Sequence, residues 1–578
     1  MSELRRLVPY LGRYRRVLVF GMLSLLLGKA AAVAAPQVLR FAVDDLTLSV
    51  STRKLAFYAS LIVGISLVEG FFRFWMRRLL IGVSRYIEYD LRGEFFGHLQ
   101  RMGPSFFHRW RTGDLMSRAA NDLSAVRMVL GPGIMYPAET VVITLAALGF
   151  MISINAELTL VSLAVMPVVS VAVKVFGAVI HKRFEAIQSK MSDISALAQE
   201  NLSGMRVVKA YAQEAAEQRK FEQTNQEYFR RNIDLVKVWG AFYPLLAVLV
   251  GLGSALVLWW GGQMVVSGAI SLGQLVAFFA YLGLLTWPMI AFGWVVNIYQ
   301  RGGASMKRLA AVFDERPDLT DAPDARWDVD ISGHVEFRGV SLRYNGTAVL
   351  RNIDLTIRAG QTVAVVGRTG SGKSTLVSLV SRLYDATEGQ VLVDGIDVRK
   401  LPLGRLRQAV GFVPQESFLF SEKVGENIAF GREEASSEEV VQAASIAGLA
   451  GDIADFPAGY DTMVGERGIT LSGGQRQRAT IARALMTDPR ILILDDALSS
   501  VDTETEERIL SQLRGVIRER TTLLVSHRIS TIKDADLIVV LDEGEIVEKG
   551  THDQLLARHG HYASLYRKQL LEEELERI

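Results

Sequence analysis

The sequence of 578 residues contains no cysteine. Disulfides, thiolate metal sites and cysteine nucleophiles are therefore excluded as sources of stability or chemistry. A large excess of one charge is also missing, because 64 Lys and Arg residues are balanced by 62 Asp and Glu residues, which leaves a formal net charge of +2. A near-neutral chain gives no electrostatic reason to expect nucleic acid as a partner.

The start of the sequence also lacks the pattern expected of a cleavable signal peptide. The basic N-terminal stretch MSELRRLVPYLGRYRR precedes the first apolar run without a small-residue cleavage site. We therefore expect a mature cytoplasmic N-terminus.

Apolar residues are what the sequence has in abundance. Hydrophobic residues make up 49% of the chain and its mean hydropathy is +0.22, which favours a membrane-embedded part. The apolar stretches end near residue 320, and after that point short β-like runs alternate with amphipathic helical patterns. We expect a membrane domain at 1–313, a polar linker at 314–330, an α/β domain at 331–565 and a charged helix at 566–578.

Six stretches of the first part have the length and apolarity of membrane spans, which need roughly 20 residues each. Six such runs in one half of a chain cannot all be buried in a soluble core. The sequence therefore predicts a membrane α-helical domain with six long transmembrane helices. They are expected at 17–43, 55–76, 134–154, 158–180, 239–262 and 272–299.

The connections between these spans alternate in length and charge. Two long connections, at 77–133 and 181–238, are rich in Arg and Lys, and positive charge marks the cytoplasmic side of a membrane protein. Both termini are then cytoplasmic, as an even number of spans requires. Because these connections keep a helical pattern, we expect the membrane helices to continue into the cytoplasm. The predicted location is the cell (inner) membrane.

Several predicted spans contain charged residues, which are costly in a bilayer and often functional, and some also contain tryptophans. Glu139 is the best candidate for a group that faces a substrate cavity, and intramembrane pairing or snorkelling is the alternative interpretation. The tryptophans fit either a cavity wall or an interfacial belt. The charged residues are Lys29, Glu69, Arg73, Glu139 and Lys174, and the tryptophans are Trp259, Trp260, Trp287 and Trp294.

The second part contains a phosphate-loop motif. VAVVGRTGSGKSTL, at 363–376, follows an apolar β-type run and precedes a helical pattern, which is the context that this motif requires. Its glycines let backbone N–H groups turn toward phosphates, Lys373 supplies positive charge, and the Ser374 hydroxyl binds Mg²⁺. The predicted phosphate-binding residues are Gly367, Arg368, Thr369, Gly370, Ser371, Gly372, Lys373, Ser374 and Thr375.

Two further stretches fit the same chemistry. ILILD, at 491–495, reads as a buried strand that brings Asp495 to the Mg²⁺ ion. LSGGQ, at 471–475, reads as a helix start capped by Ser472, with two glycines that permit close approach of an anion. The chain thus has one phosphate loop and one separate anion-binding helix start, although a capped helix alone would be an ordinary structural feature.

These motifs, taken in order, resemble those of a half-size ATP-binding cassette (ABC) exporter, and the resemblance covers nearly the full length. LSGGQ before an ILILD strand is the signature of that family. Segments 113–118 and 200–214 resemble the cytoplasmic connections that carry coupling helices, and 464–468 resembles an exporter-type segment that touches the membrane domain. By resemblance, further site residues are Tyr344 (adenine stacking), Gln415 (Mg²⁺ and water), Asp502 (D-loop), His527 (switch histidine), and Ser472, Gly473, Gly474 and Gln475 (partner nucleotide).

The resemblance implies how the chain works. Two nucleotide-binding domains would meet head to tail, so that ATP on one phosphate loop is completed by the signature helix of the other chain. A half-transporter must therefore dimerise. Closure on ATP and Mg²⁺ would switch the membrane helices between inward and outward opening and export drugs, lipids or peptides that are hydrophobic or amphipathic.

The sequence departs from the family at Asp496, where a glutamate usually follows the strand and activates water. Shortening that side chain withdraws the carboxylate by about 1.5 Å, and a misplacement of this size costs about 100-fold. This pattern favours one half of an asymmetric heterodimer. A homodimer with two slow sites and a non-transporting, nucleotide-gated regulator are the alternatives. The six spans exclude a soluble ABC ATPase, and importers normally carry their membrane domain on a separate chain.

Overall fold

The computed structural model of the chain describes residues 2–576 except 165, 345, 433, 466, 467, 469 and 499–502. For residues 2, 166, 170, 286–290, 292, 503, 504, 529, 530 and 572–576 it describes the backbone only. The chain forms two compact units. The first consists of Met1–Gln100 and Thr112–Glu315, and the second of Arg101–Arg111 and Arg316–Ile578.

The first unit is built from long helices. Their order is η1 (Ser2–Leu7), α1 (Val8–Arg13), α2 (Arg15–Leu48), α3 (Thr52–Gln100), α5 (Thr112–Ser117), the π-helical η2 (Arg118–Asp122), α6 (Leu123–Leu130), α7 (Pro132–Ile154), α8 (Ala156–Leu163), α9 (Met166–Ser203), α10 (Met205–Ala210), α11 (Glu214–Val266) and α12 (Leu272–Phe313). Short α4 (Pro104–Arg109) belongs to the second unit.

Length and composition identify the helices that can cross a membrane. Within the described residues, five helical stretches qualify, and α12 adds the shorter apolar segment Leu272–Leu285. The predicted membrane domain of long apolar helices is therefore confirmed. Helices α3, α9 and α11 also extend far beyond their apolar windows, as the charged connections predict.

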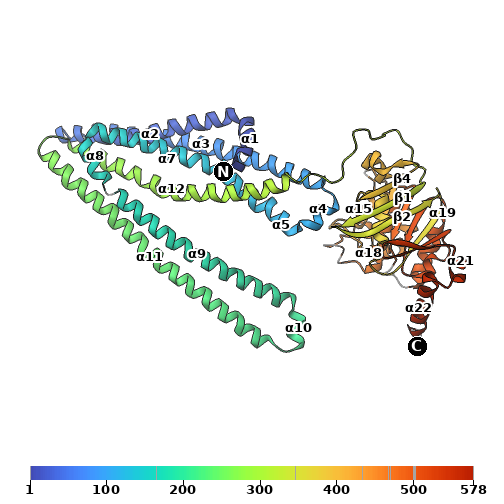
Figure 1. The fold of residues 1–578 in the computed structure, drawn as a ribbon. Coiled ribbons are helices and arrows are strands. Elements are labelled where there is room, and N and C mark those ends of the chain that lie inside the picture. Colours follow the sequence, from blue (N-terminus) through green and yellow to red (C-terminus); the bar gives the residue numbers. More distant parts are fainter. Residues whose placement is uncertain are drawn as a thin grey trace. The chain divides into compact units, whose positions relative to one another are not determined.

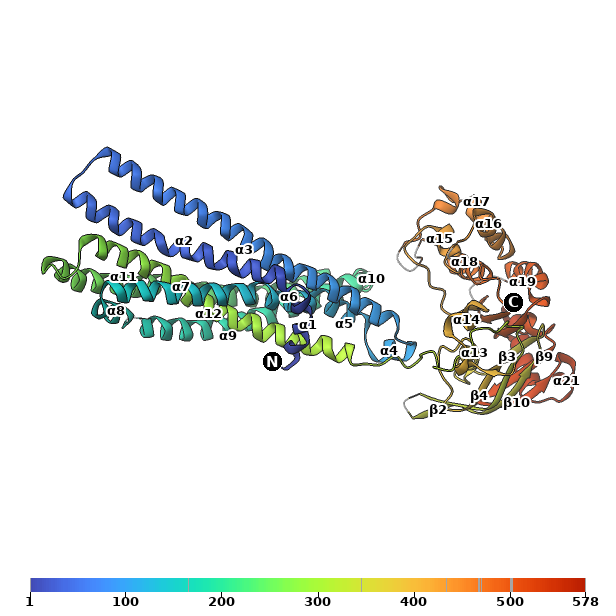
Figure 2. The same ribbon diagram turned by 90° about the horizontal axis from the view of Figure 1, so that it is seen from above.

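The helices of this unit form two groups. Helix α2 packs along α3, and α12 packs along α2, α6 and α7. Helices α9 and α11 pair with each other and are joined by α10 at one end, so that Figure 1 shows them as a long hairpin beside the other helices. Figure 2 shows α2 and α3 as a second long pair.

An ion pair between Lys29 of α2 and Glu139 of α7 lies inside the first group. Leu25 and Met135, one turn before these residues, belong to one buried apolar cluster. Val33 and Ile143, one turn after them, belong to another. The sequence favoured Glu139 as a cavity residue, but the structure pairs its carboxylate with Lys29, whose exposed fraction is only 5%.

The other intramembrane residues of interest are placed separately. Glu69 pairs with Arg73 one turn along α3. Trp260 donates from Nε1 to Glu157 over 3.2 Å, while Trp259 is exposed. Trp294 packs edge to face on Tyr136, and Lys174 is exposed. The Trp287 side chain lies outside the described part of the structure.

The second unit contains two β-sheets. A four-stranded antiparallel sheet has the order β2-β1-β4-β5, and a six-stranded sheet has the order β10-β9-β3-β8-β7-β6, parallel except for β10. The strands are β1 (Val335–Tyr344), β2 (Thr347–Ile357), β3 (Thr362–Val366), β4 (Glu388–Val393), β5 (Ile396–Asp397), β6 (Val410–Val413), β7 (Ile491–Asp495), β8 (Thr521–Val525), β9 (Leu537–Asp542) and β10 (Glu545–Gly550).

The strand residues are buried on both faces because the six-stranded sheet separates two apolar cores. One core lies between the two sheets and includes Leu376 and Val377 of α13. The other lies under the remaining helices and includes Ile481 of α18. The helices of this unit are α13 (Lys373–Val380), η3 (Val398–Lys400), α14 (Leu403–Gln408), α15 (Val424–Ala429), α16 (Ser437–Ile446), α17 (Ala450–Ala454), η4 (Gly459–Asp461), α18 (Gly473–Leu485), α19 (Thr503–Arg518), α20 (Ile529–Ile532), α21 (His552–Ala557) and α22 (His561–Glu576).

Helix α22 begins earlier than the charged pattern predicts. Its first N–H groups, on His561 and Tyr562, donate to the Glu548 carboxylate of β10 over 2.7 and 3.0 Å. A carboxylate at a helix N-terminus satisfies donors that have no partner within the helix. The predicted α/β domain after a helical membrane domain is confirmed.

Candidate functional site

The phosphate loop lies between β3 and α13. Gly367 and Gly372 have φ values of 150° and 98°, which L-residues with side chains rarely adopt. A Cβ atom at Gly367 would lie 2.0 Å from the Leu541 carbonyl oxygen. The loop is therefore restricted to glycine at this position, and its backbone turns around the Lys373 ammonium. That group donates to the carbonyl oxygens of Gly367 and Arg368, each over 2.9 Å.

Ser374 and Asp495 meet at the start of α13. The Ser374 hydroxyl donates to Asp495 Oδ1 over 3.0 Å. Burial raises the pKa of Asp495 and lowers the pKa of Lys373, although the opposite charges nearby limit both shifts. This arrangement brings a hydroxyl, a carboxylate and a cation together at the start of α13.

These residues fit Mg²⁺ and a nucleotide phosphate. A serine hydroxyl next to a carboxylate is a hard oxygen donor pair of the kind that Mg²⁺ prefers. Within the described part of the chain, the Ser371 hydroxyl is buried without a hydrogen-bond partner, and no heavy atom lies within 4 Å of a Cβ placed at Gly370. When bound here, Mg²⁺ would neutralise charge on the phosphate oxygens. Of the remaining predicted residues, Arg368 and Thr369 lie in the loop between β3 and α13, and Thr375 lies in the first turn of α13.

Three more predicted residues follow parallel strands at one edge of the sheet. Gln415 comes after β6, Asp496 directly after β7 and His527 after β8. The carboxyl ends of parallel strands share one edge, which is where α/β proteins bind ligands. Because β3, which leads to Lys373, lies in the same sheet beside β8, the topology brings all four to one edge.

Asp496 has an uncommon backbone conformation. Its φ of 49° lies in the left-handed region, and its N–H donates to the Val525 carbonyl over 2.9 Å. The charge of Asp496 acts on both Lys373 and Asp495. The structure thus holds this carboxylate in a tight turn next to the phosphate loop.

An aromatic group flanks the loop. Tyr344, at the end of β1, packs edge to face on Tyr384 with ring centres 5.2 Å apart. Tyr384 also stacks on His108 of α4 at 6.5 Å. Burial raises the pKa of Tyr344 to about 12. Sequence reasoning identified Tyr344 but missed Tyr384 and His108, because their contact joins residues that are distant in the chain.

The signature stretch starts α18 as predicted. Ser472 Oγ accepts from the Gln475 N–H over 3.2 Å, and Gln475 Oε1 accepts from the Ser472 N–H over 3.0 Å. The predicted serine cap is confirmed as a reciprocal capping box. Gln475 and Arg478 also donate to the Asp452 carboxylate of α17, over 3.0 and 2.9 Å. Asp452 carries no motif that would have revealed this role.

Sequence reasoning also missed Arg483 of α18. Its guanidinium donates to the carbonyls of Phe418 and Asn427 and lies over the rings of Phe420 and Phe430. Burial lowers its pKa to about 10. Arg483 therefore connects the signature helix to the segment that follows Gln415.

Helix α22 contributes to the surroundings of His527. Residues Tyr562, Leu565, Lys568 and Gln569 line a recess of about 180 Å³ together with Gly367 and His527. The sequence pattern of alternating charge gave no sign of this position. Predicted residue Asp502 and part of segment 464–468 lie outside the described residues.

Comparisons with known proteins identify the family that has this architecture. A family model described as "ABC transporter transmembrane region" matches residues 18–289, and one described as "ABC transporter" matches residues 350–499. The probable multidrug resistance ABC transporter ATP-binding/permease protein YheI of Bacillus subtilis is 37% identical over 99% of this chain and 98% of its own. This chain belongs to the ABC transporter family.

Other similar proteins agree in length and fold. The ATP-dependent lipid A-core flippase of Syntrophus aciditrophicus is 36% identical over 100% of this chain and 96% of its own. The ATP-bound structure of a bacterial Atm1-family ABC exporter has a TM-score of 0.79 and 32% identity, and covers 96% of this chain and 98% of its own. The ABC protein described here therefore has the half-size exporter arrangement, a multi-pass membrane domain followed by one ATP-binding domain.

Proposed function

We propose that this ABC chain is one subunit of an exporter that uses ATP to move hydrophobic or amphipathic molecules out of the cytoplasm or the inner leaflet. The observation that supports this most is the fusion of long apolar helices to a phosphate loop whose Ser374 and Asp495 are already paired. The names of relatives, a multidrug transporter and a lipid flippase, favour the same substrate classes. Both termini are proposed to be cytoplasmic, as the basic connections indicate.

Dimerisation is supported by the hairpin of α9 and α11. Helix α10 at its end has no buried residue, and Val207 within it and Tyr211 directly after it are 62% and 73% exposed. Exposed large apolar side chains on a polar cytoplasmic segment indicate a surface that a partner covers. A second chain would also supply a signature helix to the Lys373 site, while Ser472 of this chain serves the partner's nucleotide.

We further propose that the site on this chain hydrolyses ATP slowly. A general base must come within about 2.6–3.2 Å of the attacking water, directly or through one water. Asp496 has a shorter side chain than the usual glutamate and starts from a tight turn. Lys373, Ser374 and the helix N-terminus would still bind the phosphates. The intact capping box at Ser472 supports a fast site on the partner.

ATP would act by stabilising one arrangement of the membrane helices over another. It shifts the equilibrium only by its differential affinity for the two states. Binding at both sites favours closure of the nucleotide domains, and hydrolysis at the fast site allows them to reopen. Gln415 and His527 are proposed to orient the water and the terminal phosphate.

Purification of the tagged chain from its native membranes tests the proposal. We expect a second, different half-transporter at one-to-one stoichiometry, with a strand that ends Asp-Glu, and ATP-dependent transport after reconstitution in liposomes. Full ATPase activity and transport by this chain expressed alone would instead support a homodimer with two working sites. ATP binding without transport of any drug, lipid or peptide would favour a regulator.

A further inference from the structure

Arg382 lies at the end of the phosphate-loop helix α13 in a conformation that needs support. It is only 4% exposed, and its φ of 48° lies in the left-handed region. Non-glycine residues in this region cost free energy and persist only where their surroundings fix them. The contacts of Arg382 therefore show which segments of the domain stabilise this conformation at the end of α13.

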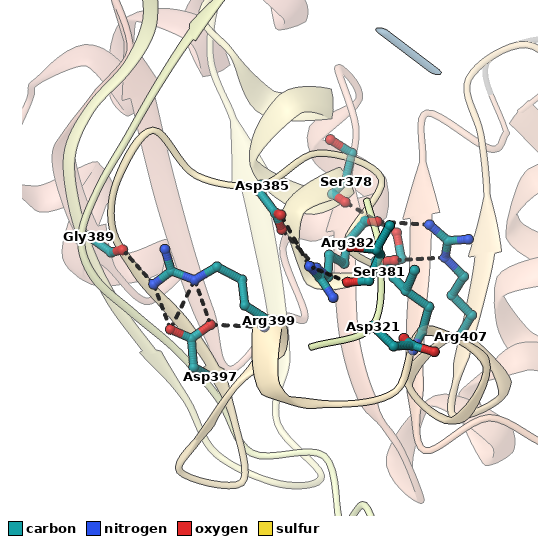
Figure 3. Close-up of polar contacts among 11 residues, drawn as sticks. Asp321, Ser378, Ser381, Arg382, Asp385, Gly389, Asp397, Arg399 and Arg407 are labelled. Carbon is teal, nitrogen blue, oxygen red and sulfur yellow. Dashed lines mark hydrogen bonds and ion pairs between the residues drawn. The ribbon is translucent and has the colours of Figure 1, made fainter. Parts of the chain in front are cut away.

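The guanidinium of Arg382 bonds to two separate segments. Its Nε and Nη2 donate to the Asp385 carboxylate over 2.8 and 3.2 Å, a fork that Figure 3 shows. Nη2 also donates over 3.2 Å to the carbonyl oxygen of Thr320. Asp385 thus orients the guanidinium, and Thr320 is tied to it through its backbone.

A second arginine fixes the same end of the helix. Arg407 of α14 donates to the carbonyls of Ser381 and Arg382 over 3.4 and 2.9 Å. Burial, together with the neighbouring Arg382 charge, lowers the pKa of Arg407. Cations at a helix C-terminus satisfy its free carbonyls and its dipole. The end of α13 is therefore a rigid attachment point.

Residues 316–321 are held by further contacts with the same unit besides the bond from Arg382. The Asp321 carboxylate accepts from the Leu403 N–H over 2.7 Å at the start of α14. Leu319 is buried, and the Asp318 carboxylate accepts from the Ser105 hydroxyl beside α4. The sequence predicts a polar linker here, but these contacts make the segment an ordered part of the ATP-binding unit.

The attached segment directly continues the last membrane helix. Helix α12 ends at Phe313, and Thr320 follows within a few residues. We propose that Arg382 is a positioning residue that ties segment 316–321 to α13. Through this tie, a displacement at the end of α12 moves Lys373 and Ser374, and ATP binding on them displaces α12. The proposal rests on the ATP-driven export proposed above and adds a coupling connection within one chain.

Substitution of Arg382 by Lys tests this role. Lysine keeps the charge but has a single ammonium in place of the planar fork, so it cannot reproduce the bonds to Asp385 and Thr320 together. Arg399→Lys is the matched control, because Arg399 forms the same kind of fork with Asp397, and its other hydrogen bond among the described residues goes to the nearby Gly389 carbonyl. Both variants are compared as the complete particle in lipid nanodiscs or liposomes.

Three measurements separate coupling from structure: thermal stability, transport per ATP hydrolysed, and hydrogen exchange of segments 316–321 and 367–374 with and without a non-hydrolysable ATP analogue. We expect Arg382→Lys to keep its stability and the nucleotide protection of 367–374. It should lose the protection of 316–321 and about two- to thirtyfold of its transport per ATP, the range of measured coupling effects. Arg399→Lys should match the unsubstituted protein throughout.

Two results would overturn the proposal. Unchanged transport per ATP and unchanged protection of 316–321 in Arg382→Lys would show that the tie transmits nothing. A parallel fall of stability, ATPase activity and transport would show a purely structural residue. If nucleotide fails to protect 367–374 even in the unsubstituted particle, the proposed ATP-driven function itself is wrong, which distinguishes the two failures.

Discussion

The hydroxyl of Ser374 donates to a carboxylate oxygen of Asp495 over 3.0 Å, although 121 positions separate the two residues in the chain. This bond joins the start of the phosphate-loop helix to the end of β7. The next residue, Asp496, is the position where the family usually has glutamate. We therefore assign Mg²⁺ binding to Asp495 and water activation to Asp496, so that a substitution can alter either role separately.

Asp496→Asn should leave steady-state ATPase activity and transport nearly unchanged, because it removes a base that is already too short to reach the water well. Replacement of the partner's glutamate by glutamine should nearly abolish both. The measurement is ATP turnover of the purified particle at saturating ATP. If Asp496→Asn alone stops turnover, Asp496 is a working base and the asymmetric proposal is wrong.

Asp496→Glu is the complementary variant. If carboxylate length is what limits this site, the longer side chain should raise turnover, up to about the 100-fold that a misplaced group costs. Single-turnover hydrolysis at this site, with the partner's glutamate replaced, gives the cleanest reading. No gain would indicate that the tight turn at residue 496, and not side-chain length, limits hydrolysis.

Ser472→Arg should be severe where Asp496→Asn is mild. It removes the capping hydroxyl and places a long cation at the start of α18, which we assign to the partner's nucleotide. Loss of one preorganised donor at comparable anion sites costs roughly 100–1,000-fold in rate. Thr480→Ser, inside the same helix, is the control and should retain activity. A mild Ser472→Arg would mean that this helix start completes no active site.

Lys29→Met should destabilise the membrane domain by up to about 3–5 kcal/mol, because it leaves the Glu139 carboxylate, which is only 16% exposed, without its cationic partner. The double variant Lys29→Met, Glu139→Leu should regain most of that loss. Glu69→Gln is the control, since its partner Arg73 is half exposed and such pairs are worth at most about 1 kcal/mol. Equal losses in the single and double variants would contradict a pairing role.

Asp394→Asn should lower the stability of the ATP-binding domain by about 1–3 kcal/mol at neutral pH. The Asp394 carboxylate accepts from the N–H groups of Ser332 and His334 over 2.7 and 2.9 Å, and its φ of 51° is one that asparagine tolerates. Asp354→Asn, which affects one such bond to the Gly339 N–H, should cost less.

The stabilities of the wild-type protein and of Asp394→Asn should depend differently on pH. Burial would raise the pKa of Asp394, but the hydrogen bonds from Ser332, His334 and Gly333 outweigh it and hold the pKa below its ordinary value. The stability that this carboxylate contributes is therefore complete above about pH 4 and is lost as the pH falls through the folded-state pKa. The difference between wild type and Asp394→Asn should shrink below about pH 4 in thermal unfolding. A constant difference would contradict this assignment.

Local patterns predicted the parts of the fold that depend on neighbouring residues. The apolar run at 134–154 corresponds to α7 at Pro132–Ile154, and Ser472 caps α18 as expected. Both features follow from helical periodicity and from the hydrogen-bonding needs of helix ends.

Contacts that depend on how distant segments pack could not be predicted. The pairing of Lys29 with Glu139 requires the register of α2 against α7, which hydropathy does not specify. Arg382 donates to the backbone carbonyl of Thr320. Because every residue has such a carbonyl, the sequence does not indicate which one accepts the bond. The charged pattern of 566–578 likewise did not reveal that α22 borders His527, because that contact depends on how α22 packs on the rest of the domain.

One consequence concerns the order in which the protein is made. Residues Arg101–Arg111 pack in the ATP-binding unit, whose main part begins at Arg316. A ribosome adds about 5–20 residues per second, so the intervening stretch of about 200 residues delays that unit by about 10–40 s. Until Leu319 and Tyr384 have been synthesised, the short helix α4 lacks the surface on which it packs. Biogenesis of this ABC protein must therefore include a late step in which α4 docks on this surface. A variant that weakens the surface should lower the amount of folded protein before it lowers the activity of each folded molecule.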